Sequence, residues 1–184
     1  MNPITDLVGN IERKGLWTKD LELDRNQFLK VKGSIDTNLY WVVQGSLRIY
    51  VVEENEEHTI RFGYTHNFIA ALDSFLDEKP SDLYIQALKK TNVKIIDKAT
   101  FIKFMQSSPE NIKTWQLMLE QLVLQQMERE RDILTMSPLE RYKRVLKRSP
   151  QLFQEIPHKY IASYLRMTPE TLSRIKKSWH GSMF

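Results

Sequence analysis

The sequence contains no cysteine among its 184 residues. Disulfides, thiolate zinc sites, cysteine-ligated iron–sulfur clusters and cysteine nucleophiles are therefore excluded together. Glycine is scarce, with six in the whole chain, and no glycine-rich loop that could cradle a phosphate is present. The Gly-x-Ser-x-Gly and His-Glu-x-x-His patterns of common hydrolases are missing as well. We therefore expect a protein that is not an enzyme and that holds neither a metal nor another cofactor.

Long apolar runs are also absent, because no stretch of about 18 or more apolar residues occurs, and no transmembrane helix is predicted. Residues 1–6 lack the basic and apolar regions of a secretory signal. The composition, 41% hydrophobic and 27% charged, is that of an ordinary globular protein. We therefore expect a cytoplasmic protein of one or two domains that has no membrane partner.

Positive charge is concentrated at the C-terminal end of the chain. The formal net charge is +4, and residues 138–184 hold ten Lys and Arg against three Asp and Glu. Such a basic segment favours contact with a polyanion. A solvated basic tail is the alternative, but the apolar periodicity of this segment argues against it.

Short strands separated by turns are predicted between about residues 20 and 97. The two clearest candidates flank Gly45, and alternate residues of the second are apolar, as in a half-buried strand. The strands are expected at residues 39–43, 46–52, 59–64, 84–88 and 93–96. A charged hairpin tip is expected at residues 53–57. This pattern predicts an antiparallel sandwich or barrel.

A helical region is predicted from about Ala99, and a long helix from Pro109 to about Leu134. Ser108 followed by Pro109 is typical of a helix start. The apolar stripe of the long helix comprises Ile112, Trp115, Leu119, Leu122, Val123, Met127 and Leu134. A long helix with such a stripe fits a dimer interface, and the alternative is a helix that lies on the strand-rich region.

Three further helices are predicted in the basic segment. Ser137, Pro138 and Glu140 form a capping box, which indicates a helix over residues 138–148 with a hinge before it. Ser149-Pro150 is expected to end this helix, and residues 151–154 to form a short turn.

The last two helices are expected to form a helix-turn-helix. The first covers residues 157–165, the turn is at residues 166–167, and the second starts at Thr168-Pro169 and runs to about Trp179. The side chains expected to pack on the first helix are Met167, Leu172 and Ile175. The side chains expected to face outward are Glu170, Thr171, Ser173, Arg174 and Lys177.

The outward side chains suit recognition of double-stranded DNA in the major groove. Arg174 can pair with guanine in bidentate fashion, and Glu170 can accept from the amino group of cytosine. Lys177, near the C-terminal end, can neutralise a phosphate. Spacing, caps and charge together favour DNA binding over an amphipathic hairpin with a solvated polar face.

Over nearly its whole length the sequence resembles the Crp/Fnr family of bacterial transcription regulators, most specifically in residues 40–50, 156–165 and 168–175. The resemblance implies an α+β fold with an antiparallel β-roll of the cyclic-nucleotide-binding type, related to the jelly-roll and the double-stranded β-helix. The implied domains are the β-roll at residues 1–107, a dimerisation helix at 108–136 and a helix-turn-helix domain at 137–184.

The resemblance also implies a function and residue roles. It implies a homodimer that binds a palindromic DNA site, with RNA polymerase and a small-molecule effector as further partners. Carried over residue by residue, it assigns base reading to Glu170 and Arg174, and phosphate contacts to Thr168 and Lys159.

The sequence departs from the family in its nucleotide-binding cassette, a Gly-Glu-Leu step followed about ten residues later by an Arg-Ser or Arg-Thr pair. Ala71, followed by Leu72, replaces the ribose-binding glutamate, and Ser81, followed by Asp82, replaces the phosphate-binding arginine. The lost charge-assisted hydrogen bond is worth roughly 1.5–3 kcal/mol. We therefore expect an unknown effector or none, and no cyclic AMP bound in the usual way. A regulator with a non-standard cyclic-nucleotide pocket and a dimeric protein-interaction module are the alternatives.

Two more departures concern the C-terminal end, and a last point concerns haem. Arg166 takes a turn position that is usually glycine, and the chain ends soon after Trp179, so the β-hairpin wing is expected to be reduced or absent. Haem sensing would need a histidine ligand. The four histidines are isolated in the sequence and are expected to face solvent: His58, His66, His158 and His180.

Overall fold

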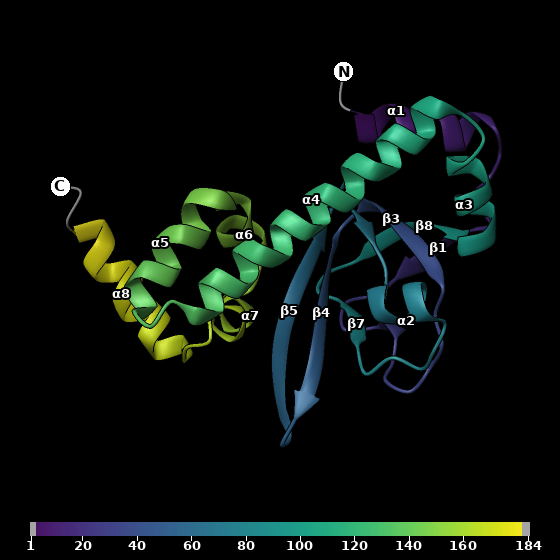
Figure 1. Cartoon of the computed structure of the whole chain (residues 1–184). Coiled ribbons are helices and arrows are strands. Elements are labelled where there is room, and N and C mark those ends of the chain that lie inside the picture. Colours follow the sequence, from purple (N-terminus) through teal and green to yellow (C-terminus); the bar gives the residue numbers. More distant parts are fainter. Residues whose placement is uncertain (1–2, 182–184) are drawn as a thin grey trace.

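The computed structural model of the chain describes residues 3–181, and side chains from Ile4 to Ser178. Eight antiparallel strands form two four-stranded sheets, ordered β1-β8-β3-β6 and β2-β7-β4-β5 (Figure 1). The strands are β1 (Lys19–Leu23), β2 (Phe28–Lys30), β3 (Asn38–Gln44), β4 (Ser46–Glu53), β5 (Glu56–Tyr64), β6 (Phe68–Ile69), β7 (Tyr84–Ala87) and β8 (Thr91–Asp97). The expected β-roll is therefore confirmed.

Helices precede, interrupt and follow the β-roll. They are α1 (Pro3–Arg13), α2 (Leu72–Asp77), α3 (Lys98–Met105), α4 (Pro109–Leu134), α5 (Pro138–Arg148), α6 (Pro150–Glu155), α7 (His158–Tyr164) and α8 (Pro169–Gly181). Among the described residues, no helix combines the length and the apolar character that a membrane crossing requires.

Alternation along the strands builds the core of the β-roll. Leu47 and Ile49 of β4 face the interior between the sheets and pack with Val42 of β3 and Val93 of β8. Gly45 joins β3 to β4 at a φ of +110°, and a Cβ there would lie 2.6 Å from the Cα atom of Thr91. The turn therefore requires glycine, for conformational and for steric reasons.

Three helices differ from the sequence-based expectations, among them α2, for which no helix was expected. No helix was expected at residues 3–13, where α1 packs Leu7 and Ile11 against α3. The predicted turn at residues 151–154 is wrong, because these residues belong to α6. Pro150 ends α5 but also occupies the first turn of α6, where its missing N–H has no intrahelical partner to lose. Burial of Leu152 in the C-terminal core then holds α6 in place.

The long helix α4 begins and ends as predicted, with the Ser108 hydroxyl accepting from the Asn111 amide at 3.2 Å. Its apolar stripe, however, divides between two faces. The half-buried side chains face the protein, as Trp115 does against Phe101, and they are Trp115, Met118, Leu119 and Leu122. The exposed side chains are Ile112, Leu117, Val123, Leu124, Met127, Ile133 and Leu134.

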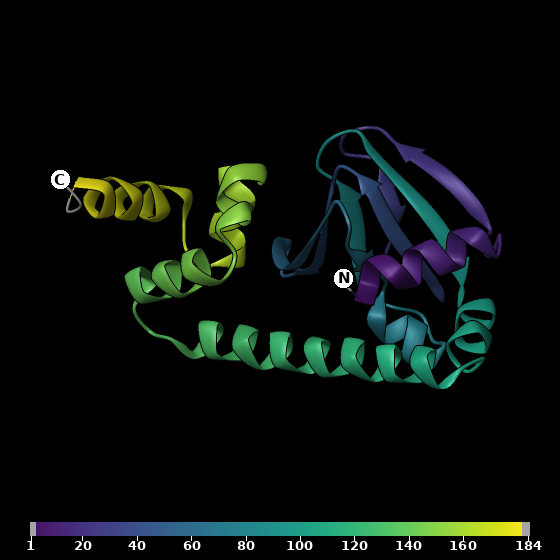
Figure 2. The same ribbon diagram turned by 90° about the horizontal axis from the view of Figure 1, so that it is seen from above.

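Helices α5 to α8 form a second core, and α4 connects them to the β-roll. Figure 2 shows the β-roll and these helices side by side along the same side of α4. Tyr142, Val145 and Leu172 are among the fully buried side chains of this core. Phe62 and Leu88 of the β-roll belong to the same cluster, so the C-terminal helices also pack on the β-roll.

Candidate nucleic-acid interface

Helices α7 and α8 are joined by a short turn, residues 165–168, whose backbone caps the end of α7. Arg166 has a φ of 53°, so it keeps the left-handed conformation of the glycine expected there, which costs a non-glycine residue about 1 kcal/mol. The amides of Arg166 and Met167 donate to the carbonyls of Ser163 and Ala162 at 3.1 and 3.0 Å. These bonds cap the end of α7.

The apolar face of α8 is buried against α7, as predicted. Leu172 is fully buried and Ile175 nearly so, in the same cluster as Ile161 and Ala162 of α7. Met167 packs at the edge of this cluster. The burial of one face fixes which side chains of α8 remain in solvent.

The opposite face of α8 forms an open groove with the N-terminal end of α7. Its volume is about 700 Å³, and its lining residues are His158, Pro169, Glu170, Ser173, Arg174, Lys177 and Ser178. The structure thus brings together four of the predicted site residues: Glu170, Ser173, Arg174 and Lys177. All four are exposed.

The other three predicted site residues lie beside the groove. The Thr168 hydroxyl accepts from the Thr171 amide at 3.2 Å and caps α8. Thr171 was expected to face outward but is half-buried, with its hydroxyl 3.2 Å from that of Thr168. Lys159 is exposed on α7, and its ammonium lies 4.7 Å from the centre of the Tyr160 ring.

Two titratable groups in the groove have shifted pKa values. A hydrogen bond from its own backbone amide, and then the hydroxyl of Thr168, hold the pKa of Glu170 below its usual range. Its carboxylate is therefore ionised and able to accept a hydrogen bond. Burial, and then the ammonium of Lys176, lower the pKa of His158, so its ring is neutral at pH 7.

The four predicted effector residues differ in burial and in their partners. Ala71 is fully buried before α2, and Leu72 is half-buried. Ser81 is also buried, and its hydroxyl accepts from the Leu83 amide at 3.0 Å. Asp82 is exposed and forms an ion pair with Lys32 at 3.2 Å. Its charge is therefore directed to solvent and partly neutralised.

Sequence reasoning missed Lys30, a buried cation beside Ser81, the residue that replaces the arginine of the family. Its ammonium donates to the carbonyls of Val31, Ser81 and Leu83 at 2.9, 3.3 and 3.0 Å. Burial lowers the pKa of Lys30. Because three carbonyl oxygens engage the three donors of the ammonium, this cation is already satisfied by the protein.

A pocket of about 370 Å³ lies beside Lys30, and its polar groups are bonded to one another. The Tyr40 hydroxyl donates to the carboxylate of Asp36 at 2.8 Å, and the backbone and side-chain amides of Asn38 donate to it at 3.0 Å each. The Asp36 amide donates to the Ser74 hydroxyl at 2.8 Å.

The metal and haem predictions concern clusters of ligand side chains and the histidines. No group of three or more His, Cys, Asp or Glu side chains is placed there to hold a metal ion. His66 is exposed, but its ring stacks on Trp41. His58 and His158 are half-buried, so they are only partly open to solvent. The side chain of His180, and residues 182–184 where a wing was considered, lie outside the described part.

Comparison with known proteins agrees with the β-roll fold of the N-terminal region. Residues 20–108 match the family model of the cyclic nucleotide-binding domain. No curated protein sequence matches the chain.

Several solved structures share the fold. A CooA variant from Carboxydothermus hydrogenoformans has a TM-score of 0.71 at 15% identity, covering 89% of this chain and 77% of its own. FixK2 from Bradyrhizobium japonicum has a TM-score of 0.69 at 18% identity, with coverages of 89% and 85%. A CRP/FNR family transcriptional regulator from Thermus thermophilus has a TM-score of 0.65 at 14% identity, with coverages of 89% and 87%. Residues 20–108 are therefore similar to a cyclic nucleotide-binding domain, and the chain has the fold of the CRP/FNR regulators.

Proposed function

We propose that the protein is a transcription regulator that binds double-stranded DNA as a homodimer, with α8 in the major groove. The observation that carries the proposal is the open groove along α8, which gathers Glu170, Ser173, Arg174 and Lys177 on the exposed face of a helix whose other face is buried. A recognition helix needs this combination of a fixed inner face and an exposed polar face.

The chemistry of the groove divides into base reading and phosphate binding. The planar fork of Arg174 matches the two acceptors of guanine, and the ionised Glu170 accepts from cytosine. Lys177, one helical turn beyond Ser173 and Arg174, is placed to meet a phosphate. Lys159 and Thr168, at the edge of the groove, are further phosphate contacts under this proposal.

The exposed apolar face of α4 supports homodimerisation. Leu117, Val123, Leu124, Met127 and Leu134 are between 41% and 71% exposed. Apolar side chains gathered on one helix face mark an interaction surface. Under this proposal residues 1–107 form the β-roll domain, residues 108–136 the dimerisation helix and residues 137–184 the DNA-binding domain.

The β-roll is proposed to bind no cyclic AMP in the usual way. Ser81 offers no positive charge to a phosphate, and the nearby ammonium of Lys30 already donates to three carbonyl oxygens. An effector of another kind, or none, then acts on this domain. Under this proposal the protein acts in the cytoplasm, where RNA polymerase is a further partner. Isothermal calorimetry is expected to show no micromolar binding of cyclic AMP.

The direct test is to sequence the genomic fragments that the protein retains and to search them for a palindrome. Arg174→Ala should relax base preference at one position of each half-site, at a cost of about 1–3 kcal/mol. Lys177→Ala should weaken binding to all sequences alike and reduce the salt dependence of the affinity by about one unit of slope. Gel shifts at several salt concentrations measure both effects. A uniform loss of affinity in Arg174→Ala would remove that residue from base reading.

A further inference from the structure

The first helix of the pair, α7, lies against the outer face of the β2-β7-β4-β5 sheet. Arg48 of β4 is only 3% exposed, and its guanidinium lies 3.9 Å from the ring centre of Tyr50 and 4.2 Å from that of Tyr160 on α7. Gln86 of β7 accepts two hydrogen bonds from the guanidinium, at 3.1 and 2.8 Å. Glu57 of β5 completes its surroundings with an ion pair at 2.6 Å.

A second contact joins α7 to β5, the edge strand of this sheet. The Ser163 hydroxyl accepts from the backbone amide of Thr59 at 3.1 Å and donates to the backbone carbonyl of Glu57 at 2.9 Å. An edge strand leaves such backbone groups unpaired unless another element satisfies them. Here α7, the first helix of the candidate helix-turn-helix, satisfies two of these groups through Ser163.

A third contact adds α4. The ring of Tyr164 lies 5.5 Å from the ring of Phe62 on β5 and 3.8 Å from the guanidinium of Arg129 on α4. Arg129 also donates to the carbonyl of Thr59 at 3.3 Å. We call these three contacts the latch, formed by Arg48, Glu57, Thr59, Phe62, Arg129, Tyr160, Ser163 and Tyr164.

The linker between α4 and α5 is bound as well, by a single guanidinium. Arg141 donates to the carbonyls of Thr135 and Met136 in the linker at 2.7 and 3.2 Å. It also donates to the carbonyls of Leu165 and Arg166 in the turn at 2.8 and 3.0 Å. The helix pair is thus held both at the linker and at the β-roll.

The latch does not cover the candidate DNA-reading face. The groove residues of α8 are exposed while α7 contacts the sheet, because Tyr160, Ser163 and Tyr164 lie on another face of the helix pair. The contact is therefore suited to fixing the orientation of the reading face rather than to hiding it.

We propose that Arg48, Tyr160 and Ser163 are positioning residues for DNA recognition, which hold the helix pair on the β-roll of the same chain without an effector. The inference rests on the proposed function. Two reading helices of a dimer must present themselves about 34 Å apart. A pair fixed in advance loses less freedom on binding two half-sites than a pair on a loose linker, so the latch strengthens binding to the palindrome.

The test compares Tyr160→Ala/Ser163→Ala with the unchanged protein on two DNA duplexes, the selected palindrome and a single half-site. Fluorescence anisotropy should show at least a tenfold loss of affinity for the palindrome and a change of less than twofold for the half-site. Tyr160→Phe keeps the aromatic ring on Arg48 and should bind the palindrome as tightly as the unchanged protein does. Phe28→Ala is the matched control, because the Phe28 ring lies tilted at 6.0 Å from that of Tyr84 on the same sheet and does not belong to the latch. Equal thermal stability by circular dichroism establishes that the variants are folded.

A distance measurement tests the latch without DNA. Since the chain has no cysteine, Glu56→Cys on β5 and Lys147→Cys on α5 place two spin labels at defined exposed positions. Labelled chains diluted with unlabelled chains report distances within one chain. The double electron–electron resonance distribution should be narrow in the reference and in Phe28→Ala, and broad in Tyr160→Ala/Ser163→Ala.

The outcomes separate the inference from the proposed function. A narrow distribution in Tyr160→Ala/Ser163→Ala overturns the latch, and a broad one with unchanged palindrome affinity overturns its positioning role. If even the unchanged protein selects no DNA sequence, the proposed function fails. The distance measurement then still supports the latch if the distribution broadens and overturns it if it does not.

Discussion

At the scale of the residue, the proposed recognition depends on groups that keep their charge in solvent. Arg174 and Lys177 are exposed, and the backbone amide of Glu170 and the hydroxyl of Thr168 keep the pKa of Glu170 low. His158 differs, because burial and Lys176 lower its pKa, so that it carries no charge at pH 7. A DNA phosphate beside the groove would favour its charged form.

DNA affinity is therefore expected to rise as the pH falls from about 8 to about 6, because the complex takes up a proton on His158. The acidic group of the groove does not contribute, since the lowered pKa of Glu170 keeps its carboxylate ionised in this range. Anisotropy titrations at constant ionic strength measure the slope. His158→Gln should flatten it and His66→Gln should not, because His66 lies on Trp41 in the β-roll. An equal slope in His158→Gln contradicts the assignment.

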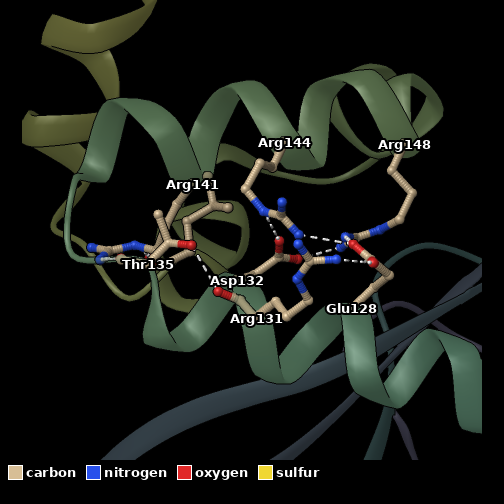
Figure 3. A network of polar contacts seen from close by, with 8 residues as sticks. Glu128, Arg131, Asp132, Thr135, Arg141, Arg144 and Arg148 are labelled. Carbon is tan, nitrogen blue, oxygen red and sulfur yellow. Dashed lines mark hydrogen bonds and ion pairs between the residues drawn. The ribbon is translucent and has the colours of Figure 1, made fainter.

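At the scale of the element, the junction of α4 and α5 is fixed by charge. Asp132 is fully buried near the end of α4, where it accepts from Arg144 at 3.0 Å and from Arg148 of α5 (Figure 3). Glu128, one turn earlier, accepts from Arg144 at 2.8 Å. The Ser137-Pro138 step begins α5 as predicted, with the Ser137 hydroxyl accepting from the Glu140 amide at 3.4 Å. The two helices on either side of the expected hinge, α4 and α5, are thus joined by ion pairs.

Asp132→Asn should lower the free energy of unfolding by about 2 kcal/mol, because it removes the buried one of the two carboxylates that pair with Arg144 and Arg148 and leaves only Glu128. The arginines are about 30% exposed, so solvent compensates part of the loss. Urea unfolding followed by circular dichroism measures the change. Glu130→Gln, an exposed change on the same helix, is the control and should alter the free energy by less than about 0.5 kcal/mol. Equal effects of the two substitutions would count against the network.

At the scale of the whole molecule, one face of α4 packs on the protein and another apolar face is exposed. Trp115 and Met118 pack against the core of the β-roll side, whereas Leu124 and Met127 are 54% and 55% exposed. The β-roll and the C-terminal helices lie along one side of α4 and leave the exposed face uncovered (Figure 2). A second copy of the chain would bury that face and place two reading helices in one assembly.

Leu124→Glu should therefore convert a dimer to a monomer, because it introduces a charge into the apolar interface. Sedimentation equilibrium measures the mass of the assembly. Gln125→Glu introduces the same charge at the next exposed position and should leave the dimer intact. The monomer should bind a half-site and lose its preference for the palindrome. A reference protein that sediments as a monomer at micromolar concentration would contradict the proposed homodimer.

Local chemistry explains which elements could be predicted from the sequence. Ser108, Ser137 and Thr168 each bond an amide three residues ahead, so the starts of α4, α5 and α8 are set within one turn of chain. Alternation likewise predicts β4, since neighbouring side chains of a strand face opposite sides. The helix α6 was missed because proline, read as a stop, also suits a helix start. Its burial against the C-terminal core is a long-range effect.

The sequence by itself determined the two architectural halves, the starts of α4, α5 and α8, and the exposed face of α8 that carries Arg174 and Lys177. Only the tertiary structure decided that Lys30 bonds Ser81 across 51 positions and that Ser163 bonds Glu57 across 106. It also decided which side of α4 stays exposed. The reason is physical: periodicity shows that a face is apolar, but not which surface covers it. Caps and alternation act between neighbours in the chain, whereas a buried cation or a docked helix depends on groups that only folding brings together.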